Sequence, residues 1–172
     1  MSMKQNRKKN LVVSRVLTVV LVLMLAVLQT TLIHGISVFH TVPNLLFIAV
    51  VCYSLLHADY SALVFAAVCG LLLDVTGGRT VGVNTLFCLY AAYFCIRISG
   101  SLFNNNVFVS MVFVMLLSIP YELFTYVLYF TVWGHGAFGY AFLCKILPVV
   151  LYNFLMTLII YPVTRSMTGW RA

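Results

Sequence analysis

Long apolar runs separated by short polar stretches make up nearly the whole chain. The first run covers 11–33 and would form a helix of about 34 Å, enough to cross a hydrocarbon core of roughly 30 Å. It is too long for the apolar core of a secretory signal peptide, so we predict a retained first helix. Later runs predict further helices at 81–98, 107–132 and 140–163.

The run from Pro43 to Leu73 is too long for a single crossing, because one helix of that length would measure about 46 Å. The polar cluster within it is 57–61, which predicts a reversal at that point. We therefore expect helices at 43–56 and 60–75, the first with its proline in the first turn. The complete pattern predicts about six helices.

Composition places these helices in a membrane. The chain has 172 residues, of which 63% are hydrophobic and 8% charged, whereas soluble domains are about 45–50% apolar and 25% charged. Because these few charged side chains cannot cover a water-soluble surface, lipid must be the solvent for most of the chain. The predicted fold class is all-α: a polytopic transmembrane bundle of about six helices, with 1–172 forming a single transmembrane domain.

The ten basic residues set the predicted orientation. Five lie before or at the start of the first helix, and 1–10 form a short basic N-terminus that we expect in the cytoplasm. Six crossings then place Arg97, Arg165 and Arg171 inside, which leaves two basic residues outside. We predict a multi-pass protein of the cytoplasmic membrane with both termini cytoplasmic. The basic residues form no face that suggests nucleic-acid binding.

The sequence shows no catalytic or metal-binding pattern. Its five cysteines lie in apolar runs without a C-x-x-C pair, and its four histidines are scattered near helix ends. No G-x-S-x-G, S-x-x-K, H-E-x-x-H or P-loop motif occurs. We expect no metal, no cofactor and no enzymatic activity.

Two acidic residues within the apolar runs need an explanation. An acidic group costs a few kcal/mol at the centre of a membrane helix, so Asp74 and Glu122 each need a partner. The topology brings Lys145 and Arg79 within range, and we interpret Glu122–Lys145 or Asp74–Arg79 pairs as structural. An ion pathway is the less favoured reading, because no series of polar groups continues through the membrane.

A stripe of small residues recurs every four positions in the helix predicted at 60–75. A smooth stripe of this kind lets another backbone approach closely, and we favour a partner helix within the same chain over one from another chain. The helix-packing candidates are Ala62, Ala66 and Gly70.

Several fragments, taken in order, carry a family resemblance that covers nearly the whole chain. The residues at 43–46, 70–74 and 77–84 resemble the core of the MreD family of rod shape-determining proteins. The family often has Asp after the helix-two proline and a Gly-rich entry to helix three, where this chain has Asn44 and 58–61. Supporting pieces are Gln29-Thr30, Glu122, Ile146-Leu147-Pro148 and Leu151-Tyr152-Asn153.

The resemblance implies a scaffold of the bacterial cell-elongation machinery. Such a protein would bind an MreC-like partner and, through it, an MreB-like filament and peptidoglycan synthases, and would support rod shape and lateral peptidoglycan synthesis. Partner-binding or structural candidates are Asp74, Arg79, Gly82, Asn84, Glu122, Lys145, Tyr152 and Asn153. The loop 76–84 is the favoured recognition surface, because loops carry recognition more often than buried stripes.

The family is also similar in architecture to the six-helix substrate-binding components of energy-coupling factor transporters. The alternative function is therefore that of a small-molecule, vitamin-like binding component of a membrane transporter. Its binding groups would have to come from Asp74, Asn84, Glu122, Tyr152 and Asn153.

Overall fold

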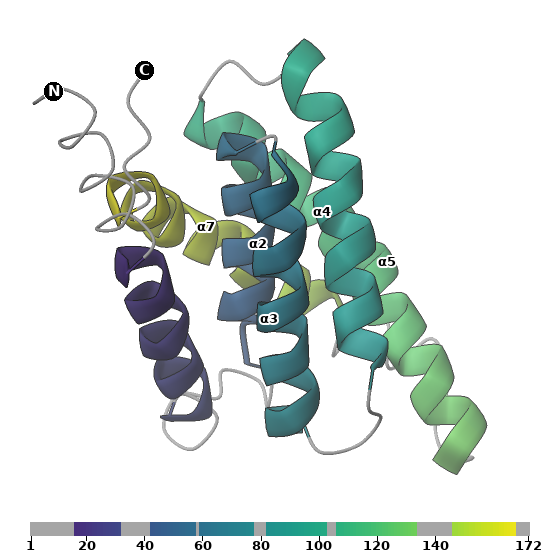
Figure 1. Cartoon of the computed structure of the whole chain (residues 1–172). Helices are drawn as coiled ribbons and strands as arrows, with labels where there is room; N and C mark the ends of the chain where they lie inside the picture. Colours follow the sequence, from purple (N-terminus) through teal and green to yellow (C-terminus); the bar gives the residue numbers. More distant parts are fainter. Residues whose placement is uncertain are drawn as a thin grey trace, which may run out of the picture.

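The structure is a computed structural model that describes residues 16–31, 42–57, 59–77, 82–102, 106–133 and 146–167. Within these ranges it contains six helices and no strand, so the predicted all-α class is confirmed. Figure 1 shows the N-terminal helix on the left, α2 in the centre of the bundle, and α4 on the right with α5 behind it. The helices are the N-terminal helix Val16–Thr31, α2 (Leu45–Leu56), α3 (Tyr60–Gly77), α4 (Val83–Leu102), α5 (Val107–Trp133) and α7 (Leu147–Met167).

The four helices from α2 to α5 start within two residues of the predicted positions, and several helices end later. α3 and α5 begin at the predicted residues, while α3 continues two residues beyond its predicted end and α4 and α7 four residues beyond theirs. Polar residues that predict a loop are instead part of the helices, where their hydroxyl groups bond to backbone carbonyls. Thr76 bonds to its own helix at Leu72, and Ser99 donates to Leu55 of α2. The predicted start of the last helix, 140–145, lies outside the described residues.

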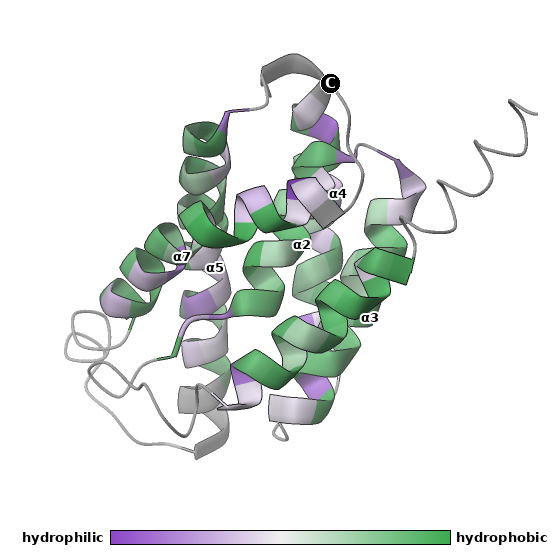
Figure 2. Ribbon diagram, turned by 90° about the vertical axis from the view of Figure 1, so that its left-hand side faces the viewer, coloured by the Kyte–Doolittle hydropathy of each residue, from purple (hydrophilic) through white to green (hydrophobic). Residues whose placement is uncertain are grey.

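Three helices of the described ranges are long and apolar enough to cross a membrane: Tyr60–Gly77, Val107–Leu128 and Leu147–Ser166. Figure 2 shows that apolar positions dominate the helices. The other three, the N-terminal helix, α2 and α4, are apolar over shorter lengths. Six crossings therefore stay a prediction.

The short helix α2 is the core of the bundle. Its 12 residues span about 18 Å, well short of a bilayer core of roughly 30 Å. All of its residues except Tyr53 are buried, and it contacts α3, α4, α5 and α7. Both ends of α2 therefore lie inside the protein, where the free N–H and C=O groups of its terminal turns need partners from other helices.

The turn between α2 and α3 is made by aromatic packing. The His57 ring lies 4.6 Å from the ring of Tyr53, and Tyr53 stacks on Phe65 of α3 at 4.3 Å. The His57 N–H closes α2 by bonding to the Tyr53 carbonyl at 2.8 Å. Burial lowers the pKa of His57 against the opposing effect of the Asp59 carboxylate. A reversal that lacks a helix-breaking residue is thus fixed by ring contacts.

The α3–α4 pair is the most extensive helix contact in the bundle. A Cβ atom at Gly70 would lie 2.4 Å from Thr85 Cα and 3.0 Å from Thr85 N, so only glycine lets the two backbones come this close. Ala62 and Ala66, the other small residues of the stripe, are fully buried. At Gly70 the neighbouring helix belongs to the same chain.

Candidate functional site

A continuous network of buried and half-buried polar side chains around the first turn of α2 links the N-terminal helix, α2, α3, α4, α5 and α7. It begins at Asn44, which caps α2 by accepting the Phe47 N–H at 3.1 Å. Its own N–H donates to Asn153 Oδ1 of α7 at 2.9 Å. Gln29 of the N-terminal helix accepts the Leu46 N–H at 3.1 Å. Three N–H groups at the start of α2 thus find acceptors inside the bundle, as their burial requires.

Asp74 provides acceptors for the backbone N–H groups at the start of α4. Its Oδ1 accepts the Asn84 N–H at 3.0 Å, and its Oδ2 accepts the Thr85 N–H at 3.1 Å and the Thr85 hydroxyl. A carboxylate at a helix N-terminus is also stabilised by the helix dipole. Just before this turn, Gly82 adopts φ +94°, a conformation that glycine reaches at little cost. The carboxylate of one helix therefore holds the first turn of the next.

Tyr121 of α5 joins the two caps. Its hydroxyl donates to Asn84 Oδ1 at 2.7 Å and accepts from Asn44 Nδ2 at 3.1 Å. Its ring stacks on Phe47 at 4.8 Å and meets the edge of Phe87 at 5.6 Å. On the α7 side, Asn153 Nδ2 donates to Ser118 Oγ at 3.2 Å. The starts of α2 and α4 are therefore joined through one phenol.

Chemically, this network is a set of satisfied helix caps. Asn44, Asp74 and Asn153 are buried, and their polar atoms bond to groups of neighbouring helices rather than converging on an open space. The described residues contain no group of three or more His, Cys, Asp or Glu side chains able to hold a metal ion. The arrangement is suited to fixing helix positions.

The structure brings together only some of the residues singled out in the sequence. Asp74, Asn84 and Asn153 lie in the network, and Gly82 precedes it. Tyr152 lies half-buried on α7 beside the network. Glu122 is half-buried on α5 and has interactions of its own. Arg79 and Lys145 lie outside the described residues, so the Glu122–Lys145 and Asp74–Arg79 pairs stay predictions.

Three members of the network were not proposed as site residues from the sequence. Tyr121 gives no signal in the sequence beside the charged Glu122. Thr85 and Ser118 look like ordinary small helix residues. Gln29 and Asn44 entered only through the family resemblance. The signal that could identify such residues is an amide or hydroxyl side chain beside a predicted helix start, because the backbone N–H groups there need acceptors.

Comparison with known proteins identifies the family of the chain. No curated protein and no solved structure matches the chain. A family profile described as rod shape-determining protein MreD matches residues 9–168 of the 172. That match covers every helix of the described ranges, including both capped helix starts. The chain belongs to the MreD family of rod shape-determining proteins.

Proposed function

We propose that this chain is a non-enzymatic scaffold of the bacterial cell-elongation machinery, located in the cytoplasmic membrane. The observation that carries the proposal is the family match over residues 9–168. As a scaffold it binds an MreC-like protein and, through it, connects to an MreB-like filament and to peptidoglycan synthases. In this way it supports rod shape and lateral peptidoglycan synthesis.

The internal use of polar groups supports a scaffold over a small-molecule carrier. A ligand site needs a few polar groups that converge on a pocket. Of the residues that a vitamin-like ligand would need, Asp74, Asn84 and Asn153 bond within the network. The open groove between α4 and α5 is lined almost entirely by apolar and aromatic side chains. These features favour a protein that acts through its surface.

The partner-binding surface that we propose is the loop 76–84, at the end where α3 meets α4. Residues 78–81 of it lie outside the described ranges, but both of its flanks are described. Asp74 ties the last turns of α3 to the first turn of α4 through three hydrogen bonds. Flanks held in this way fix the two points from which the loop departs, and a surface with fewer freely moving parts loses less conformational entropy when it binds.

Two exposed valines on α3 provide a matched test of this surface. Val75 and Val64 are 79% and 65% exposed and, eleven residues apart, lie on nearly the same side of the helix. Val75 is next to the loop and Val64 is three turns away. We expect Val75→Trp to reduce co-purification of the MreC-like partner in mild detergent several-fold, and Val64→Trp to leave it unchanged.

Mass spectrometry of the same samples separates the scaffold from the carrier. The scaffold predicts a stoichiometric protein partner and no stoichiometric small molecule. A bound vitamin-like compound in a preparation without an MreC-like protein would refute the scaffold function. Equal loss of partner in both valine variants would remove the loop as the binding surface.

The proposed orientation has six crossings with both termini in the cytoplasm, as the distribution of basic residues indicates. Single cysteines in a cysteine-free background test it. A cysteine at position 37 or 135 should react with an impermeant reagent from outside, and one at position 104 only after permeabilisation. The reverse pattern would show that the orientation is wrong.

A further inference from the structure

A groove of about 270 Å³ opens between α4 and α5, with α2 at its base. Three of its aromatic side chains are also exposed: Tyr90 by 67%, Tyr93 by 55% and Phe94 by 50%. The groove is therefore an open trough rather than an enclosed cavity. Its lining consists of Phe47, Phe87, Tyr90, Ala91, Tyr93, Phe94, Leu117 and Pro120.

The groove exists because α4 and α5 each pack against a different neighbour. α4 makes its main contact with α3, α5 makes its main contact with α7, and α4 touches α5 at few points. Figure 1 shows α5 running obliquely behind α4, with its lower end clear of the other helices. The Phe87 ring, 4.8 Å from that of Phe124, bridges the two helices on one side of the gap.

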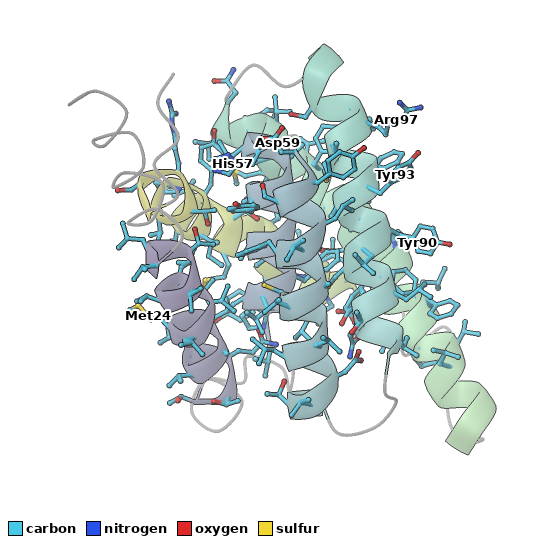
Figure 3. The ribbon with its side chains drawn as sticks, in the orientation of Figure 1. Met24, His57, Asp59, Tyr90, Tyr93 and Arg97 are labelled. Carbon is cyan, nitrogen blue, oxygen red and sulfur yellow. The ribbon has the colours of Figure 1, made fainter. Side chains whose placement is uncertain are left out.

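A positive charge lies at one end of the groove. Arg97 is exposed and follows Tyr93 and Phe94 by four and three residues, which places it on the same side of α4. Figure 3 shows Tyr90, Tyr93 and Arg97 projecting from that side of α4, one above the other. No acidic partner of Arg97 occurs among the described residues. The guanidinium is therefore available to an anion from outside the chain.

The length of the groove indicates which kind of molecule it can hold. Arg97 and Phe87 are ten residues apart, so the distance between them along α4 is about 15 Å. This is half the thickness of a hydrocarbon core of roughly 30 Å. A groove that starts at the membrane surface thus ends near the middle of the bilayer. The transmembrane helix of a partner would need a contact surface through both leaflets, whereas one lipid acyl chain needs one leaflet.

We propose that the groove holds an acyl chain of an anionic phospholipid whose headgroup phosphate binds Arg97. Guanidinium groups bind phosphate through paired, charge-assisted hydrogen bonds. A lipid with net negative charge is favoured because a zwitterionic headgroup carries its own cation, which competes with the arginine. The two exposed tyrosines suit the boundary region, where aromatic rings with a polar end accumulate. The proposal requires only that α4 lies in a membrane, so it is independent of the MreC-like partner.

Quenching of tryptophan by brominated lipid provides the test. In a background with Trp133→Phe and Trp170→Phe, Phe94→Trp places a reporter in the groove. Ile159→Trp is the matched control, because Ile159 is 59% exposed and both residues lie eight positions before the end of their helices. Each protein is reconstituted in phosphatidylcholine vesicles that contain increasing fractions of brominated phosphatidylglycerol or brominated phosphatidylcholine.

We expect brominated phosphatidylglycerol to quench the groove reporter at a roughly fivefold lower mole fraction than brominated phosphatidylcholine. This factor corresponds to about 1 kcal/mol for one basic residue at an anionic headgroup. The control reporter should show little preference. Arg97→Gln should abolish the preference in the groove and leave quenching by phosphatidylcholine intact.

Equal preference at both reporters, or a preference that survives Arg97→Gln, would overturn the proposal. So would protection of the groove reporter from both lipids when an MreC-like protein is co-reconstituted, since that result would make the groove a helix-docking site. None of the lipid measurements without partner depends on the scaffold function, so the two proposals can fail separately.

Discussion

The two sides of α4 differ in how they meet their neighbours. Towards α3, a glycine allows backbone contact and Asp74 caps the first turn of α4. Towards α5, large aromatic side chains separate the helices and leave the groove. In a membrane, apolar side chains alone provide little drive for helices to associate, because lipid is equally apolar. Close packing and polar bonds therefore determine which helix pairs form, and the aromatic side of α4 remains open to other molecules.

Removal of the Asp74 carboxylate should have the largest effect on the tight side. Asp74→Ala leaves two backbone N–H groups and one hydroxyl of α4 without their acceptor. At roughly 1–3 kcal/mol for each buried unsatisfied donor, we expect a loss of about 4 kcal/mol in the free energy of unfolding. Thermal unfolding in detergent measures it. Asp59→Ala, at an exposed aspartate that precedes α3, is the control and should cost no more than the roughly 1 kcal/mol of a lost helix N-cap.

Gly70→Ala tests whether the close contact of α3 and α4 is essential. The new Cβ would lie 2.4 Å from a backbone atom of Thr85, so the helices must separate. Overpacking of this kind costs about 1–3 kcal/mol. Gly77→Ala is the matched control on the same helix, because its Cβ would meet nothing closer than 3.9 Å. Equal melting temperatures for the two variants would contradict the assigned contact.

Tyr121→Phe removes the link between the two helix caps and keeps the ring. Asn44 Nδ2 and Asn84 Oδ1 lose their common partner, while the ring contacts with Phe47 and Phe87 remain. We expect a loss of about 1–2 kcal/mol. Tyr93→Phe, on the groove side, should cost nearly nothing because Tyr93 is more than half exposed. A double-mutant cycle of Tyr121→Phe with Asn84→Ala should show coupling between the two positions.

The smallest effect is expected on the open side. Phe94→Ala removes a half-exposed ring from the groove without touching a helix cap, so stability should change by no more than about 0.5 kcal/mol. Thermal unfolding in lipid-free detergent provides the measurement. A loss comparable to that of Gly70→Ala would mean that α4 packs tightly on both sides, and the contrast drawn above would be wrong.

The helical fold could be predicted from the sequence because apolar runs and polar breaks are local signals. The starts of α3 and α5 follow directly from the cluster near Asp59 and from the polar residues before Val107. The role of Asp74 could not be predicted in the same way. Charge pairing predicts an arginine or lysine partner, and the Asp74–Arg79 pair stays a prediction. The bonds that the structure shows for Asp74 come mainly from backbone N–H groups, which carry no signature in the side-chain sequence. Tyr121 is 37 residues from its partner Asn84, so only the folded arrangement reveals the link.

The short central helix also constrains the order of assembly. α2 is made early, but the acceptor for the Asn44 N–H is Asn153, which lies 109 residues later in the chain. Near the C-terminus of α2, the Leu55 carbonyl accepts its hydrogen bond from Ser99 of α4, which is also made later. α2 is too short to span lipid by itself, and its ends have no hydrogen-bond partners until α4 and α7 are in place. It therefore cannot lie in the bilayer as an independent segment. The core can therefore close only after α7 has been synthesised, and a chain that ends before α7 lacks a complete core.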